Sequence, residues 1–371
     1  MSRPIYFTNK VYWSLHDMAI GAGSMQQFTF LGPHHFEWKE VPVPQLENAG
    51  QAIVHPLAVT RCDLDLYIAN GSIRMRDSPF AFGHEIAGEV TDVGDNVCTV
   101  SPGDRVIVPF QINCGTCANC LTGLTNACTS VPAYSAYGLA QSSGREWGGG
   151  LSDYVLVPFA DAMLVKIPDT VSLPVAAAIS DNASDGYRTV AEPLRDYPGA
   201  DVLIVGGLAQ SVGLFAVQAA RALGAKRVVY LDFDQDRLAQ AKALGAEAVM
   251  TRYEPDLPVD HQFLVTVDAS NLPYGLVHAL ASTAPCGVCT GVSAGVQIMD
   301  GLPLFEMYMK GITYNISRVH ARAEIDSVLE CARCGHISHQ DVITTSVPFS
   351  MAAETIADPD SKIVFVQDQP S

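Results

Sequence analysis

The segment DVLIVGGLAQSVGLFAVQAARALGA, residues 201–225, decides the fold of this chain. It predicts a continuous apolar strand, a turn at Gly206 and Gly207, and an alanine-rich helix that contains Gly213. Glycines in such a turn let the backbone approach a pyrophosphate, which then rests on the N-terminus of the helix. The glycine spacing departs from the usual G-x-G-x-x-G pattern. If Gly213 is the last glycine of that pattern, its first position falls on Leu208. The segment therefore predicts a dinucleotide site only together with the strand that follows.

That following strand, RVVYLD, ends in Asp232. A carboxylate at this position accepts hydrogen bonds from both hydroxyl groups of the adenosine ribose, and it repels a 2′-phosphate. The next two residues, Phe233 and Asp234, provide no cation that would attract such a phosphate. The sequence therefore predicts NAD rather than NADP as the cofactor. The alternative is that Asp232 is only a solvated strand end or a helix cap.

Alternating helices and strands surround this segment from about residue 174 onward. Helices are predicted for PVAAAIS and QDRLAQAKALGA, and strands for FLVTVDAS and GVCTGVS. The alternation predicts a doubly wound parallel sheet with helices on both faces. After about residue 318 the sequence becomes β-like again, with one helix at AEIDSVLECARC and a final strand at KIVFVQ.

The residues before this region form short β-runs separated by glycine, proline and asparagine. From Gln26 onward the runs are QFTFLG, FEWKEVPVP, QAIVHPLAV, EIAGEVTDVG and DRVIVPF. This pattern predicts a compact, barrel-like β-domain. With 371 residues, of which 48% are apolar, the chain is long enough for about two domains with cores of their own.

Charge and hydropathy exclude several classes of partner. The net charge of −17 would repel a phosphate backbone, so we expect no nucleic-acid partner. The apolar run from Val202 to Val217 is interrupted by glycines, Gln210 and Ser211, so a buried strand, turn and helix explain it better than a membrane span. The N-terminal residues lack the continuous apolar core of a signal peptide. We therefore expect a cytoplasmic protein without membrane contact, in which clustered cysteines bind metal rather than form disulfides.

Four cysteines lie close together in a glycine-rich loop with the spacing C-x2-C-x2-C-x7-C, namely Cys114, Cys117, Cys120 and Cys128. Such tight spacing lets one loop fold four sulfurs around a tetrahedral zinc ion at about 2.3 Å. Four thiolates leave no open coordination position, so this zinc is expected to be structural and not catalytic. Disulfides or free thiols are the alternative.

A second group of metal-ligating residues comes from three separate segments. Cys62 follows a predicted strand, His84 lies in GHEIAGEVTDVG, and Asp181 precedes the dinucleotide-binding half. Together they would provide three protein ligands and one open position, which is what a catalytic zinc requires. Each residue alone has a simpler reading, because a single Cys or His at a strand end is usually structural and Asp181 could cap a helix.

The chain resembles zinc-containing medium-chain dehydrogenases/reductases in four features that follow one another in the same order. They are Cys62, the string GHExxGxVxxVG at residues 83–94, the four-cysteine loop and the segment 201–225. The resemblance covers nearly everything from Met25 onward. It implies a GroES-like β-barrel catalytic domain and a Rossmann domain that binds NAD. The implied limits are 1–181 and 318–371 for the catalytic domain, with 1–25 as an N-terminal extension, and 182–317 for the Rossmann domain.

By this resemblance, Cys62 and His84 are zinc ligands. Glu85 is a neighbouring carboxylate with transient access to the coordination shell, and Asp65 orients the ligand histidine. The third position departs from the commonest pattern, because many relatives place cysteine or glutamate where this chain offers Asp181. The string Ser180-Asp181 is similar to the zinc-ligand aspartate of glutathione-independent formaldehyde dehydrogenases and formaldehyde dismutases.

The resemblance also assigns the remaining cofactor contacts and the activity. Thr290, Gly291 and Val292 are expected beside the nicotinamide, and Lys362 is expected to contact a cofactor phosphate. The implied protein is a zinc-dependent alcohol or aldehyde dehydrogenase with two zinc ions per chain and NAD. Its substrate would be a small alcohol or carbonyl compound, and the chain would form a homodimer or homotetramer.

Two positions near Cys62 depart from the family pattern. Leu64 stands where many relatives start a hydroxyl relay, and Tyr67 is a possible substitute. Asp63 fills a site that is often basic or small, where a carboxylate near the pyrophosphate is unfavourable unless it points away. These departures leave two alternatives to the dehydrogenase: a formaldehyde dismutase-like enzyme that retains NAD, and a catalytically idle family member.

Overall fold

The computed structural model describes most of the chain. Of the expected N-terminal extension, only residues 23–25 belong to the described part. The described residues are 23–73, 75, 78–139, 146–254, 261–292, 301–338, 342–343, 345–359 and 362–368. None of the helices within these ranges combines the length and the apolar character that crossing a bilayer requires.

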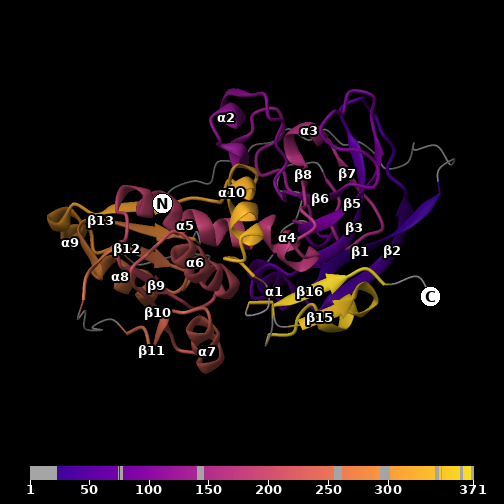
Figure 1. The fold of residues 1–371 in the computed structure, drawn as a ribbon. Coiled ribbons are helices and arrows are strands. Elements are labelled where there is room, and N and C mark those ends of the chain that lie inside the picture. Colours follow the sequence, from indigo (N-terminus) through magenta and orange to yellow (C-terminus); the bar gives the residue numbers. More distant parts are fainter. Residues whose placement is uncertain are drawn as a thin grey trace, which may run out of the picture.

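A six-stranded parallel sheet forms one half of the molecule (Figure 1). Its strands lie in the order β11-β10-β9-β12-β13-β14, so the first strand of the region is central and the chain winds outward in both directions. This order confirms the predicted doubly wound sheet, and it puts a crevice at the carboxyl ends of β9 and β12. The strands are β9 (Val202–Val205), β10 (Val228–Asp232), β11 (Glu247–Met250), β12 (Phe263–Asp268), β13 (Thr283–Gly291) and β14 (Thr313–Ile316).

Both faces of this sheet are covered, because neighbouring side chains of a strand point to opposite faces. On β9, Val202 and Ile204 belong to the core shared with α5 (Asn182–Asp196) and α6 (Gln210–Ala222). Leu203 and Val205 belong to the opposite core, which contains side chains of α8 (Pro273–Ala281). All four side chains are buried, which explains why the strand reads as a continuous apolar run instead of an alternating one.

The other half is built mainly from antiparallel β-structure. Its central strand, β3 (Ala52–Thr60), pairs with β5 (Glu85–Val93) and, near its end, with β16 (Ile363–Val366) from the other end of the chain. The predicted return of β-structure after residue 318 is therefore confirmed, whereas the exact domain limits stay predictions. The remaining strands are β1 (Ser24–Gly32), β2 (His35–Pro42), β4 (Phe80–Ala81), β6 (Arg105–Val108), β7 (Val155–Val157), β8 (Val165–Lys166) and β15 (Thr345–Pro348).

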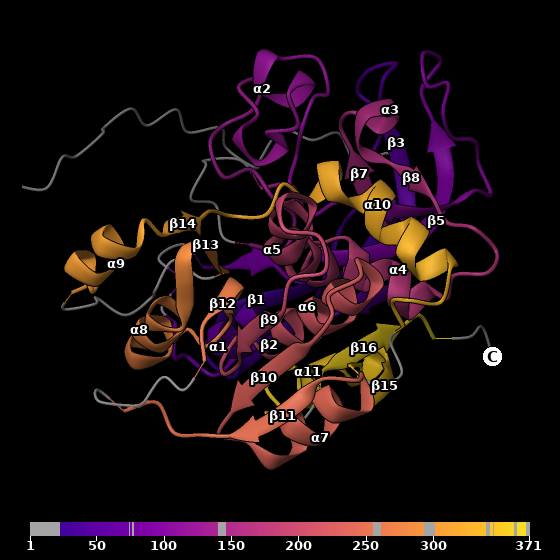
Figure 2. The same ribbon diagram turned by 60° about the vertical axis from the view of Figure 1, so that its left-hand side comes forward.

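Two helices join the halves. α4 (Leu173–Ile179) packs against β3 and β5 on one side and against α5 on the other, and α10 (Ala321–Arg333) packs on α4 and α5 (Figures 1 and 2). The other helices are α1 (Asp63–Ala69), α2 (Ala118–Leu121), η1 (Thr125–Ala127), α3 (Ala160–Met163), α7 (Gln235–Ala243), α9 (Leu304–Lys310), η2 (Phe349–Met351) and α11 (Ala352–Thr355).

Candidate active site and metal centres

Cys62, His84 and Asp181 converge between the two halves. One sulfur, one imidazole nitrogen and one carboxylate oxygen lie within 4.8 Å of one another, and all three residues are buried. The antiparallel pairing of Thr60 with Glu85 brings the end of β3 and the start of β5 together, and with them Cys62 and His84. Asp181 joins them from the junction of α4 and α5. The structure thus brings together the three dispersed residues that the sequence indicated.

The imidazole of His84 lies between two carboxylates. Its Nδ1 is 3.3 Å from Asp65 Oδ1, and its Nε2 is 3.3 Å from Asp181 Oδ2. Burial disfavours the imidazolium, but the charge of Asp65 and the hydrogen bond that the ring donates to Asp181 outweigh it and raise the pKa of His84 well above its usual value. The other oxygen of Asp65 accepts a hydrogen bond from the Cys62 backbone N–H at 3.1 Å. Asp65 therefore fixes the ring and the loop beside it.

The donor set of this cluster fits a zinc ion. Burial, together with the nearby charge of Asp181, raises the pKa of the Cys62 thiol. Without a cation, one buried site would have to hold a thiol beside a carboxylate, which costs free energy in a low-dielectric interior. A divalent cation bound by sulfur, nitrogen and oxygen removes that cost, and three protein ligands with one open position are characteristic of catalytic zinc.

Glu85 lies behind the cluster, outside the set of atoms that converge. Its Oε2 is 2.9 Å from Lys362 Nζ and also accepts from the Thr60 hydroxyl, while Oε1 accepts from the Asn182 backbone N–H at 3.1 Å. Burial raises the pKa of Glu85 to about 7, although Lys362 acts in the opposite direction. In this arrangement Glu85 holds Lys362, and the transient zinc contact implied by the resemblance stays a prediction.

Asn182 is a central residue that the sequence reading missed. Its Nδ2 donates to Cys62 Sγ at 3.2 Å and to Asp181 Oδ2 at 3.1 Å. Its Oδ1 accepts from Lys362 Nζ at 2.5 Å, and Ser211 Oγ lies 2.8 Å from the same oxygen. The one signal in the sequence was its position next to Asp181. Asn182 therefore connects the metal cluster with the first turn of α6.

The glycine turn leads from β9 into α6. A Cβ on Gly206 would lie 2.4 Å from the Tyr230 hydroxyl, so no larger residue fits there. A Cβ on Gly207, whose φ is +151°, would lie 2.7 Å from a backbone oxygen of Ser270. Gly213 lies in the second turn of α6. The hydroxyl of Tyr67 donates to Leu208 O in this turn at 3.1 Å, so its hydrogen bond goes to the turn and not to the Cys62–His84–Asp181 cluster.

Asp63 also contacts the start of α6. Its Oδ2 accepts from the Ser211 backbone N–H at 2.9 Å, and its Oδ1 accepts from the Ser211 hydroxyl at 2.8 Å. The carboxylate therefore points toward the helix N-terminus, where the turn would receive a phosphate, and not away from it. This is the opposite of the orientation that the sequence required for a favourable site.

Asp232 is buried at the end of β10 and paired with a cation. Arg237 forms two hydrogen bonds with its carboxylate, Nε to Oδ2 at 2.8 Å and Nη2 to Oδ1 at 2.7 Å. The guanidinium also lies over the ring of Phe233, 5.0 Å from its centroid. The sequence reading considered only the next two residues and missed this arginine, which lies in the first turn of α7.

The other expected cofactor residues lie near the same edge of the sheet. Thr290 and Gly291 end β13, and Gly291 pairs with Asp268 at the end of β12. Val292 follows directly, and its N–H donates to Asp268 O at 3.1 Å. Lys362 lines a pocket together with Arg61, Asp63, Gln210, Ser211 and Arg237.

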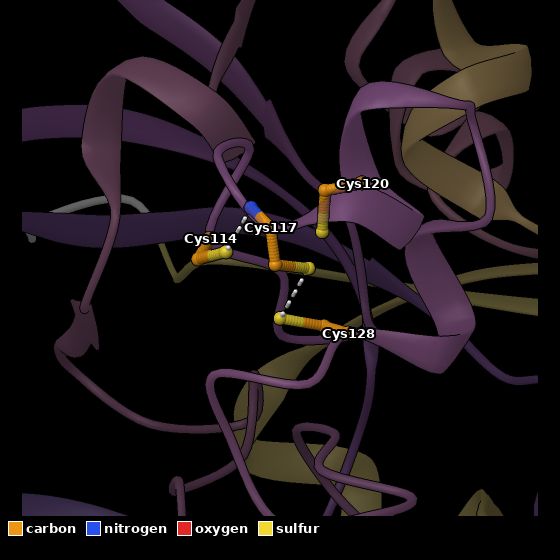
Figure 3. Close-up of side chains that lie close together, drawn as sticks. All are labelled: Cys114, Cys117, Cys120 and Cys128. Atoms are coloured by element: carbon orange, nitrogen blue, oxygen red, sulfur yellow. Dashed lines mark hydrogen bonds between the residues drawn. The ribbon is translucent and has the colours of Figure 1, made fainter.

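The four cysteines of the second centre lie in a separate lobe around α2 (Figure 3). Their sulfurs all lie within 4.8 Å of one another, and Cys114 and Cys128 are buried. None of the four forms a disulfide, so the disulfide alternative is wrong for them. Hydrogen bonds from the backbone of Thr129 and Cys120 lower the pKa of Cys117 to about 5, which favours a thiolate. Four sulfurs around one point fit a structural zinc.

Comparisons with known proteins agree with this arrangement. Residues 48–169 match the alcohol dehydrogenase GroES-like domain, and residues 211–333 match the zinc-binding dehydrogenase family. A glutathione-independent formaldehyde dehydrogenase of Pseudomonas aeruginosa is 35% identical over 246 residues, 63% of this chain but only 60% of that protein. A medium chain reductase/dehydrogenase of Acremonium sp is 31% identical over 60% of this chain and 74% of that protein. Alcohol dehydrogenase TADH from Thermus sp. ATN1 superposes with a TM-score of 0.81 at 26% identity, over 92% of this chain and 100% of that one.

Proposed function

Because this chain belongs to the zinc-binding alcohol dehydrogenases of the medium-chain dehydrogenase/reductase family, we propose that it transfers a hydride between an alcohol or aldehyde and NAD. The observation that carries the proposal is the buried convergence of Cys62, His84 and Asp181 within 4.8 Å. These three residues would hold the catalytic zinc, and the four cysteines of the α2 lobe would hold a structural one. When bound, zinc supplies a Lewis acid for the substrate oxygen and the nicotinamide accepts the hydride.

The residues around the cluster prepare it for this chemistry. Asp65 binds the Nδ1 side of His84, which leaves Nε2 directed at the ligand position. Asn182 donates to both Cys62 and Asp181, so it stabilises the negative charge on the two anionic ligands. Neither residue exchanges a proton with the substrate in this role. They fix the ligand geometry before the substrate arrives.

The choice between NAD and NADP depends on the end of β10. Asp232 lies where an adenosine ribose would bind, which favours NAD, but it is buried and both of its oxygens accept from Arg237, a cation that the two residues after Asp232 do not provide. NAD remains the proposed cofactor because the Asp232 carboxylate pairs with the Arg237 guanidinium and offsets its charge. Gly206 and Gly207 let the turn approach the dinucleotide closely. Thr290, Gly291 and Val292, at the end of β13, are proposed to line the nicotinamide. Lys362 is proposed to bind a phosphate, in exchange for part of its present contact with Glu85 and Asn182.

The position of Arg318 near the Cys62–His84–Asp181 cluster indicates which substrates should be tested. Phe110 lies 5.4 Å from the His84 ring and packs against Val319. The preceding Arg318 is partly buried, and its guanidinium lies 5.3 Å from the centroid of Tyr134. Among the residues that the structure describes, no carboxylate pairs with this guanidinium within 4.0 Å. A substrate panel for this protein should therefore include alcohols and aldehydes that carry a carboxylate, beside neutral ones and hydrated formaldehyde.

The test combines metal analysis with NAD reduction. Purified protein is expected to contain about two zinc ions per chain and to reduce NAD, in preference to NADP, with at least one member of the panel. Cys62→Ala should lose one zinc ion and all measurable turnover, whereas Cys117→Ser should lose the other ion and thermal stability. Full activity of Cys62→Ala would refute the proposal. One zinc ion per chain in the unaltered protein would instead indicate an idle family member.

The same activity assay distinguishes the dehydrogenase from a dismutase that retains its NAD. Disproportionation of formaldehyde without added NAD would indicate a dismutase that keeps its dinucleotide. Strict dependence on added NAD would eliminate that alternative.

We also propose that copies of this chain associate as a homodimer or homotetramer. β14 is an edge strand of the parallel sheet, and the neighbouring α9 has no buried residue. Unpaired strand edges and exposed apolar helices are characteristic of surfaces that another chain covers.

A further inference from the structure

The N-terminus of α6 is the position where this fold would receive the cofactor's pyrophosphate. The first N–H groups of a helix have no partner inside the helix, and the helix dipole makes this end positive. In this chain the Ser211 N–H at that end already donates to Asp63 Oδ2 at 2.9 Å, and the Ser211 hydroxyl donates to Asp63 Oδ1 at 2.8 Å. An anion from the chain itself thus occupies the place of an anion from the ligand.

The cationic side chains near Asp63 are likewise bound by other groups of the chain. Arg61 Nη1 donates to backbone oxygens of Ile356 at 2.9 Å and Asp358 at 2.5 Å. Lys362 Nζ is bound by Glu85 and Asn182. The pocket between these residues and α6 measures about 100 Å³. Sites for whole small molecules start at about 300 Å³, so this pocket holds only a part of a dinucleotide.

From this arrangement we propose that Asp63 is an internal competitor of the cofactor pyrophosphate: a dinucleotide binds only after the Asp63 carboxylate has left Ser211. The inference rests on the proposed use of a dinucleotide. It adds that the affinity for the dinucleotide is set by a residue next to the metal ligand Cys62. A phosphate and the carboxylate repel each other, and each satisfies the same N–H group, so the two cannot share the site.

The competition also connects the cofactor with the metal cluster. Ser211 Oγ lies within hydrogen-bond distance of both Asp63 Oδ1 and Asn182 Oδ1, at 2.8 Å each. When Asp63 leaves, the hydroxyl remains free for Asn182, whose Nδ2 contacts Cys62. Displacement of Asp63 thus changes the hydrogen bonding of the residue that holds two of the proposed zinc ligands.

The test measures binding of ADP-ribose and NADH to the full chain by calorimetry and by nicotinamide fluorescence. Asp63→Asn, which keeps the size of the side chain and removes its charge, is expected to bind both ligands at least about tenfold more tightly than the unaltered protein. Asp236→Asn is the matched control, because Asp236 lines the same pocket but is exposed and does not bond to α6. The control is expected to change the affinity less than about threefold.

Asp63→Ser tests the same prediction with a smaller side chain. A zinc content of two ions per chain shows that either variant is folded. Equal affinity of the unaltered protein and both Asp63 variants would overturn the inference while the dinucleotide function stands. The same gain in Asp236→Asn would also overturn it, since a general charge effect would then explain the result. If no protein binds ADP-ribose or NADH, the proposed function itself is wrong.

Discussion

At the residue scale, Asn182 is one amide that contacts two of the proposed zinc ligands. It donates to the sulfur of Cys62 and to the carboxylate of Asp181, and it is buried. Hydrogen bonds to charged ligands are stronger than neutral ones, and partners of this kind typically change metal affinity 10- to 100-fold, which is about 1.4 to 2.7 kcal/mol.

Asn182→Ala is therefore expected to weaken zinc binding at the Cys62 cluster by about 10- to 100-fold. The measurement is a chelator titration with separate detection of the two ions released per chain. The four-cysteine centre serves as the control inside the same molecule, because Asn182 does not touch it. Simultaneous loss of both ions would mean that the substitution unfolds the protein, and unchanged release of the first ion would contradict the role assigned to Asn182.

At the same scale, the sequence indicated the three residues that converge better than it indicated the residues that support them. Cys62, His84 and Asp181 carry chemistry that few other residue types provide, and their segments match a family pattern, so they were found from the sequence. Asn182 and Arg237 act through hydrogen bonds whose partners come from distant segments. An asparagine next to an aspartate, or an arginine in a helix, looks ordinary until the fold shows what it contacts.

At the scale of the element, the strand ends decide where charge is buried. Asp268, at the end of β12, accepts hydrogen bonds at one oxygen from the Ser270 N–H at 3.0 Å and from its hydroxyl at 2.5 Å. Burial nevertheless raises the pKa of Asp268 from 3.8 to about 6, because the two hydrogen bonds only partly offset the lost hydration. A folded-state pKa above the unfolded value means that ionised Asp268 lowers stability.

Asp268→Asn is accordingly expected to raise the free energy of unfolding at pH 8, by up to about 3 kcal/mol. The folded protein binds more protons than the unfolded one between pH 4 and 6, so the cost of Asp268 grows as pH rises through this window. The advantage of the variant should therefore shrink as pH falls from 6 toward 4. Urea unfolding at a series of pH values measures it, and an advantage that is independent of pH would contradict the assigned cause.

The elements themselves were predicted unevenly. The strands around residues 201–232 and the helix α6 are confirmed, because buried parallel strands and alanine-rich helices have distinct compositions. The helices α5 and α8 were not specified from the sequence. α5 contains a glycine, a proline and many polar residues, and it becomes a helix mainly through its packing on α6 and α10.

At the scale of the whole molecule, the predicted family and its two-part fold are confirmed by the matches over residues 48–169 and 211–333. Helix α9 carries a group of exposed apolar side chains. The side chains of Leu304, Phe305, Tyr308 and Met309 on α9 are between 65% and 80% exposed. Monomers rarely leave such a group of large apolar side chains in water.

Tyr308→Glu is therefore expected to shift the protein toward the monomer, as measured by light scattering after size-exclusion chromatography. A charge at the centre of an apolar contact costs several kcal/mol when the contact forms, while the isolated subunit is unaffected. Leu121→Glu is the control, because Leu121 is 73% exposed and belongs to α2, which lies in another part of the fold than α9 (Figure 2). An unchanged molar mass in Tyr308→Glu, or a fall in Leu121→Glu, would exclude α9 as the contact.

The pairing of β16 with β3 has a consequence for the synthesis of this protein. A ribosome makes residues 58–60 about 300 residues before their partners, residues 364–366. Until those partners emerge, the end of β3 is a nascent strand without a neighbour on that side, while the parallel sheet can already assemble. Open strand edges of this kind attract other chains. A premature stop just before residue 363 would therefore produce a polypeptide that contains the whole parallel sheet yet is prone to aggregate.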